Sequence, residues 1–131
     1  WPRRHLVPME SVRHPVWVVW PGAASEVARV LQVAARHEVA VVPYGGGSNL
    51  VGGAGFVDDR PVLVVDTKRM SRVLELDETS LIVQAQAGIT GGDLDEYLRA
   101  RGMFIGHLPS SLAQSTLGGW LATRSAGALM S

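Results

Sequence analysis

The sequence has no cysteine, few aromatic residues and no excess of either charge. Only 6% of its 131 residues are aromatic, and twelve basic residues balance twelve acidic ones. Without Cys there can be no disulfide and no thiolate metal site. The absence of Cys fits a reducing compartment, so we expect a cytoplasmic protein. A net charge of zero gives no support for a nucleic-acid partner, which would need a basic patch. The four His residues form no metal-ligand pattern, so we expect no metal.

Long hydrophobic runs are also missing. The longest cover about five residues, far short of the ~20 of a membrane-spanning helix, so we expect no transmembrane segment. The basic start, 1–5, leads into no apolar stretch and does not resemble a secretion signal. Because the chain begins with Trp1 and not Met, and stops without an obvious terminal element, we expect it to be a piece of a longer protein.

The remaining composition is that of a globular domain, with 47% hydrophobic residues. Alternation of apolar runs and helical periodicity predicts a βαββ half over about 15–67 and a second α+β half over about 68–131. The expected strands of the first half are 16–20, 39–42 and 62–66, with a helix capped by Ser25 between the first two. The second half is expected to hold an antiparallel hairpin (73–77 with 81–87), a helix over 94–101 capped by Asp93 and ended by Gly102, and a short strand over 103–105.

A glycine-rich segment, Pro43-Tyr44-Gly45-Gly46-Gly47-Ser48-Asn49, follows the second of these strands. In strand–helix–strand units with a parallel sheet, ligands bind at the carboxyl ends of the strands. Consecutive glycines allow positive φ, and their N–H groups can converge on an anion. This predicts a diphosphate cradle. The alternative is an ordinary surface turn. The segment lacks the spacing of a Rossmann fingerprint and the Lys of a Walker loop, so phosphates would meet main-chain and small polar groups.

A second unusual stretch, 106–127, has small and hydroxyl residues where a core helix would carry Leu and Ile. Thr116 is predicted to cap a short helix ending at Thr123. The start of that helix would present free N–H groups to an anion. Gly118 and Gly119 each cost about 1 kcal/mol relative to Ala in a helix, which indicates a packing or ligand requirement.

Taken together, these segments resemble the FAD-binding, PCMH-type domain of the vanillyl-alcohol-oxidase family, and within it the alkyldihydroxyacetonephosphate synthase group. The resemblance also uses Gln86 to Gly91 and the segment from Gly106 to Pro109, in matching order from about 15 to 127. It implies a two-part α+β fold that holds FAD. Many relatives bind the flavin covalently through a His where this chain has Gly47, so non-covalent FAD is implied. Many also have Thr-Ser where this chain has Ser48-Asn49, which keeps the donors.

The resemblance implies a set of cofactor-binding residues in both segments. They are Pro43, Tyr44, Gly45, Gly46, Gly47, Ser48, Asn49, Pro109, Ser110, Ser111, Ser115, Thr116, Gly119, Thr123, Arg124, Ser125 and Ala126. For Tyr44, covering the ligand and merely filling the loop are both open, and Arg124 is assigned to the FAD side. His107 is interpreted as a structural residue bonded to a loop carbonyl in preference to a flavin contact. The tryptophans Trp17, Trp20 and Trp120 are assigned to the core.

The activity implied is that of an FAD-dependent oxidoreductase, in which the flavin accepts hydride from a small-molecule substrate. An ether-lipid synthase of the alkyldihydroxyacetonephosphate type is the sharper alternative, and a non-catalytic nucleotide-binding fragment is another. Relatives continue into a substrate domain that this chain does not include, so no catalytic residue is assigned. A homodimer is a further possibility.

Overall fold

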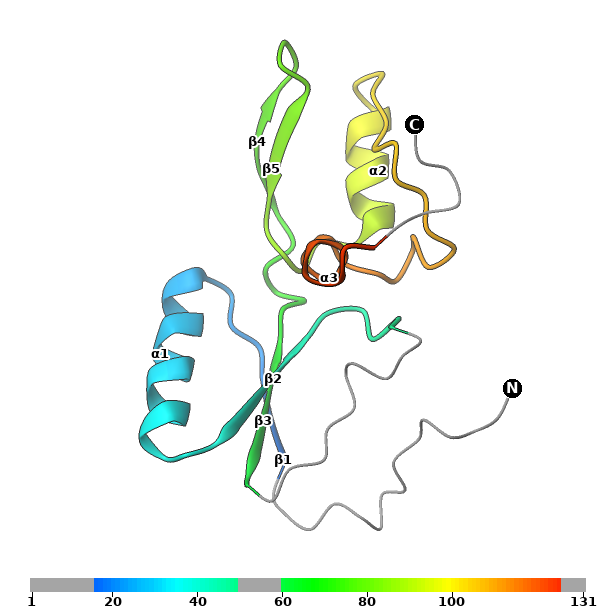
Figure 1. Cartoon of the computed structure of the whole chain (residues 1–131). Helices are drawn as coiled ribbons and strands as arrows, with labels where there is room; N and C mark the ends of the chain where they lie inside the picture. Colours follow the sequence, from blue (N-terminus) through cyan, green and yellow to red (C-terminus); the bar gives the residue numbers. More distant parts are fainter. Residues whose placement is uncertain (1–15, 50–59, 126–131) are drawn as a thin grey trace, which may run out of the picture. The chain divides into compact units, whose positions relative to one another are not determined.

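The computed structural model describes residues 16–49 and 60–125 (Figure 1). These residues form two compact units. Unit 1 contains the described residues of 16–44, 49 and 60–67. Unit 2 contains 45–48 and the described residues from 68 onward. The glycine loop therefore belongs to unit 2, although it directly follows a strand of unit 1 in the sequence.

Unit 1 is a three-stranded parallel sheet with one helix. Its elements are β1 (Val16–Val19), α1 (Ala24–Arg36), β2 (Ala40–Tyr44) and β3 (Val62–Asp66). The strand order is β1-β3-β2, and Val65 of β3 is paired with Val19 on one side and Pro43 on the other. The expected third strand is thus confirmed in the same sheet. It lies between β1 and β2, because its apolar run suits a central strand buried on both faces.

Two predictions in unit 1 are wrong in detail. The helix is capped at Ala23, without a side-chain cap, and Ser25 lies inside it. The carboxylate of Glu26 accepts a hydrogen bond from the Gly22 N–H at 2.7 Å. One amide group just before the start of the helix therefore has a side-chain partner. Trp17 and Trp20 are 48% and 43% exposed and are not core residues.

The exposure of the two tryptophans follows from their position on the edge of the sheet. The first is in β1, an edge strand, and the second directly follows it. The indole of Trp20 instead donates to the Asp66 carboxylate at 2.9 Å. This bond satisfies a buried acidic side chain at the end of β3.

Unit 2 packs a hairpin against a helix. Its elements are β4 (Val73–Asp77), β5 (Ile82–Ala85), α2 (Gly91–Arg99) and α3 (Leu117–Thr123). The hairpin is antiparallel as predicted, with a bulge between Val73 and Glu75. The core cluster is formed by Ile89, Leu94 and Leu98, and inward-facing residues of both strands pack on it. Figure 1 shows α2 beside the hairpin.

Helix α2 begins earlier than predicted. Its N-cap is Thr90, whose hydroxyl accepts from the Asp93 N–H at 3.1 Å. Gly91 and Gly92 are therefore part of the helix. Gly102 has a φ of +74° just beyond the helix, as its predicted role as a stop requires. The predicted strand over 103–105 is absent from the described structure, where the Met103 N–H instead donates to the carbonyl of Leu98.

Candidate functional site

The glycine loop packs directly against the second small-residue segment within unit 2. A Cβ on Gly45 would overlap the hydroxyl oxygen of Thr116, and a Cβ on Gly46 would overlap the carbonyl group of Gln114. The second clash involves backbone atoms, including the Gln114 carbonyl carbon at 2.7 Å. Gly47 has a φ of +63°, which favours glycine. These two segments, distant in sequence, therefore meet because the loop has no side chains in the way.

The main-chain N–H groups of Gly45 to Ser48 have no acceptor among the described residues. Consecutive unpaired amides in a turn with positive φ are suited to an anion. The Ser48 hydroxyl, at the end of the loop, also has no partner in the described part of the chain. The loop therefore offers donors that the protein itself does not use.

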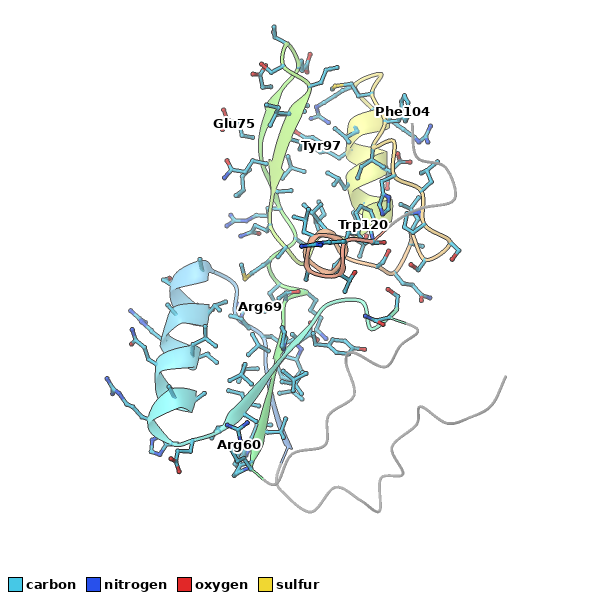
Figure 2. The ribbon with its side chains drawn as sticks, in the orientation of Figure 1. Arg60, Arg69, Glu75, Tyr97, Phe104 and Trp120 are labelled. Atoms are coloured by element: carbon cyan, nitrogen blue, oxygen red, sulfur yellow. The ribbon has the colours of Figure 1, made fainter. Side chains whose placement is uncertain are left out.

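The second segment, by contrast, uses most of its polar groups internally. The Trp120 indole donates to the Ser115 hydroxyl at 2.8 Å, and that hydroxyl donates to the Ser111 carbonyl at 2.8 Å. Ser115 and Thr116 are only 4% and 6% exposed. Figure 2 shows Trp120 extending from α3. These buried residues act as the support on which the glycine loop rests.

The N-termini of both helices in unit 2 are closed by backbone carbonyls. In α3, Leu117 N–H donates to Ile89 and Gly118 N–H to Ala87, at 3.0 and 2.8 Å. The Gly119 N–H is directed at the Thr116 hydroxyl, which confirms Thr116 as N-cap. In α2, the first two amides are capped by the carbonyls of Ser115 and Leu112. The expectation of free amides at the start of α3 is therefore wrong, since the turn after β5 occupies them.

The two glycines of α3 differ in what surrounds them. A Cβ on Gly118 would lie 2.8 Å from the Cβ of Ala87 and 2.9 Å from its carbonyl oxygen. Gly118 is therefore required for packing. A Cβ on Gly119 would approach only the Thr116 hydroxyl, at 3.3 Å. Packing does not account for Gly119, which is exposed and remains available for close approach of a ligand.

The remaining predicted site residues fall into three groups. Pro43, Tyr44 and Asn49 belong to unit 1. Ser110 is exposed, and the hydroxyls of Ser110 and Ser111 have no partner in the described structure. Other members of the set have internal roles: the Thr123 hydroxyl donates to the Gly119 carbonyl, and the Pro109 carbonyl and the Ser125 N–H take part in turns. Ala126 lies outside the described residues.

Arg124 ends α3 in the left-handed conformation, with φ 51° and ψ 48°. This conformation costs a non-glycine residue roughly 1–2 kcal/mol. Its side chain is exposed and has no ion-pair partner among the described residues. The backbone thus presents a guanidinium at the end of the second segment, where it can meet an anionic group.

His107 and Trp120 form an aromatic pair. Their rings are 4.7 Å apart between centroids and nearly perpendicular, at 77°. Trp120 is buried, as predicted, at 8% exposure. The expected bond from His107 to a loop carbonyl is not found among the described residues, and the Nε2 atom of His107 is buried without a hydrogen-bond partner.

Gly91 has a packing role that was not predicted from the sequence. A Cβ there would clash with the six-membered ring of Trp120, so Gly91 is the residue that admits the indole between α2 and α3. The pair Gly91-Gly92 does not reveal this role by itself, because the contact is with a residue far along the chain. Over the described ranges, no cluster of His and carboxylate residues could hold a metal, and no helix is both apolar and long enough to cross a membrane.

Comparisons with known proteins show what this chain is similar to. A family model described as FAD binding domain matches residues 15–131. The chain is 40% identical over 120 residues to the alkyldihydroxyacetonephosphate synthase of Trypanosoma brucei brucei, covering 89% of this chain and 20% of the synthase. It is 34% identical over 113 residues to the glycolate oxidase subunit GlcD of Bacillus subtilis, covering 86% of this chain and 24% of the subunit.

A solved structure has the same fold. A structure of an alkyldihydroxyacetonephosphate synthase superposes with a TM-score of 0.80 and 41% identity, over 84% of this chain and 20% of that one. The chain therefore spans about a fifth of the length of the relatives it matches.

Proposed function

The chain belongs to the family of FAD binding domains, and from that membership we propose that it is the FAD-holding part of an FAD-dependent oxidoreductase. When bound, FAD supplies hydride acceptance at the flavin, and the protein supplies binding, orientation and electrostatics. The observation that carries the proposal is the glycine loop, whose four consecutive amides lack acceptors in the described structure while neighbouring helix ends are closed.

In this proposal the amides of Gly45 to Ser48 donate to the diphosphate of FAD. Each such charge-assisted bond is stronger than a bond between neutral groups, and the loop needs no lysine. The loop has no His, so FAD is held there without a covalent bond. Gln114 and Thr116 fix the loop from behind, because their atoms fill the space that side chains at Gly45 and Gly46 would need.

The flavin side of FAD is assigned to the second segment. Support comes from the free hydroxyls of Ser110 and Ser111, the open surface at Gly119 and the exposed guanidinium of Arg124. The buried pair Ser115 and Thr116 contributes by holding the segment in place. The other residues of the predicted set, in both segments, remain predictions for contacts with FAD.

A second candidate concerns the activity of the whole protein. The chain is 40% and 41% identical to the alkyldihydroxyacetonephosphate synthases of Trypanosoma brucei brucei and Dictyostelium discoideum, against 34% for the glycolate oxidase subunit. This difference favours a synthase of ether-lipid type among the possible enzymes. A substrate domain outside this chain would bind the small-molecule substrate and supply catalytic side chains. A cytoplasmic location and a homodimer remain part of the proposal.

The proposal is tested by titrating the purified protein with FAD and following the quenching of flavin fluorescence. We expect saturable binding in the wild type and at least a tenfold loss of affinity in Gly46→Ala, because the new Cβ forces the loop away from Gln114. Gly92→Ala is the matched control, since its Cβ would make only an ordinary 3.4 Å contact with Ala113. A protein that never binds FAD refutes the proposal, and equal affinity in Gly46→Ala refutes the assigned loop.

A further inference from the structure

The peptide bond that joins β2 to the glycine loop is held by two hydrogen bonds from a single residue. The Thr67 N–H donates to the Tyr44 carbonyl at 3.0 Å, and the Thr67 hydroxyl donates to the same oxygen at 3.2 Å. Tyr44 and Thr67 both belong to unit 1. A main-chain carbonyl oxygen has two lone pairs, so Thr67 occupies both acceptor positions of this oxygen.

The hydroxyl bond goes beyond what the sheet requires. The last pair of the β2–β3 ladder is Tyr44 with Asp66, and Thr67 follows directly. The Thr67 N–H extends the ladder by one bond, which every residue except proline could supply. The side chain of Thr67 is only partly buried, so its hydroxyl has access to water and burial does not force it to use this carbonyl.

The two bonds also act on the N–H group at the other side of the same peptide bond, that of Gly45. The peptide unit is planar, so fixing the carbonyl of Tyr44 fixes the direction of the Gly45 N–H, and covalent geometry alone carries this effect. Hydrogen bonds accepted by the carbonyl polarise the unit and make its N–H a stronger donor. The Gly45 N–H is the first of the loop amides that have no acceptor among the described residues.

We propose that Thr67 is a positioning residue of the glycine loop: its N–H and hydroxyl orient the Tyr44–Gly45 peptide and strengthen the Gly45 N–H as a donor to an anion. That this anion is the diphosphate of FAD rests on the proposed function. Thr67 itself touches no ligand in this proposal, because it acts through the peptide bond alone.

The effect on the peptide is tested without a ligand, by NMR of the protein labelled with ¹³C and ¹⁵N. Thr67→Val keeps the branched shape and removes the hydroxyl, so the Tyr44 carbonyl ¹³C and the Gly45 amide ¹⁵N should both move upfield. Thr67→Ser should restore both, because it keeps a hydroxyl. Thr79→Val makes the same chemical change in the exposed hairpin turn and should leave both signals in place. Thr67→Ala also removes the hydroxyl and replaces the valine variant if that one does not fold.

The effect on the donor is tested by titrating the same variants with FAD and with ADP, which shares the diphosphate. Thr67→Val should bind both ligands about fivefold more weakly, the factor expected for the loss of one neutral hydrogen bond. Thr67→Ser and Thr79→Val should bind like the wild type.

Three results would overturn the proposal. They are unchanged Tyr44 and Gly45 signals in Thr67→Val, a failure of Thr67→Ser to restore them, and wild-type affinity in Thr67→Val. A lower midpoint of thermal unfolding with an unmoved Gly45 amide would show a merely structural role. A wild type that binds neither ligand refutes the proposed function instead, and the signals of the free protein then still decide whether Thr67 sets the Gly45 amide.

Discussion

Substitution of the adjacent glycines of α3, Gly118 and Gly119, tests whether each is needed for packing or for ligand binding. Replacing either by Ala gains about 1 kcal/mol of helix propensity. In Gly118→Ala this gain is opposed by the new Cβ, which would lie 2.8 Å from the Cβ of Ala87 and 2.9 Å from its carbonyl oxygen. Neither atom is at the end of a flexible side chain, so backbone must move, at a cost of about 1–3 kcal/mol. The net expectation is a loss of up to about 2 kcal/mol.

Gly119→Ala should behave in the opposite way. Its Cβ meets only the Thr116 hydroxyl, at 3.3 Å, and a small rotation relieves that contact. The unliganded protein should therefore be unchanged or more stable by up to about 1 kcal/mol. If the ligand approaches at this position, the affinity for FAD should fall by about tenfold, which corresponds to about 1.4 kcal/mol.

Thermal unfolding followed by circular dichroism measures the change in stability, and fluorescence titration measures the change in affinity for FAD. Each kcal/mol of stability should shift the midpoint of thermal unfolding by about 4 °C, which is readily resolved. The reasoning is refuted if Gly118→Ala is as stable as Gly119→Ala. The assignment of Gly119 to the ligand surface is refuted if its Ala variant binds FAD as tightly as the wild type.

Two further substitutions test local features of unit 2. Thr90→Ala removes the N-cap of α2 and should lower the free energy of unfolding by about 1 kcal/mol, measured by urea unfolding. Thr90→Ser keeps a capping hydroxyl and should retain most of the wild-type stability. At the hairpin turn, hydrogen bonds from the side chain and backbone of Ser80, and from the Thr79 backbone, lower the pKa of Asp77 below its ordinary 3.8. A lowered pKa stabilises the fold above the unfolded value, so Asp77→Asn should be less stable near neutrality and the difference should vanish as the pH falls below about 3.8. A difference that grows in acid would contradict this.

The strands of unit 1 and the hairpin of unit 2 could be predicted because their residue patterns are local and strong. The run 62–65 is apolar without interruption and forms most of the central strand β3. Three consecutive glycines stand out in the sequence. In the structure two of them are needed, because a Cβ at Gly45 or Gly46 would overlap Thr116 or Gln114.

What could not be predicted depends on contacts far apart in sequence. Asp93 is a good cap by itself, but Thr90 takes the role because Gly91 must enter the helix to admit Trp120. The amides of α3 looked free from local sequence, and only the fold brings the carbonyls of Ala87 and Ile89 to them. No sequence pattern indicates that Oδ1 of Asp95 and Nε2 of His107 are buried without a hydrogen-bond partner among the described residues.

The central claim is that the amides of the glycine loop, and not those at the start of α3, hold the diphosphate of FAD. The most direct measurement is an amide ¹H–¹⁵N NMR spectrum recorded during addition of FAD, with ADP as a second ligand that shares the diphosphate. We expect large downfield shifts at Gly45 to Ser48 with both ligands, and small changes at Leu117 and Gly118, whose amides are already bonded. Large shifts at Leu117 and Gly118 with an unchanged glycine loop would contradict the account.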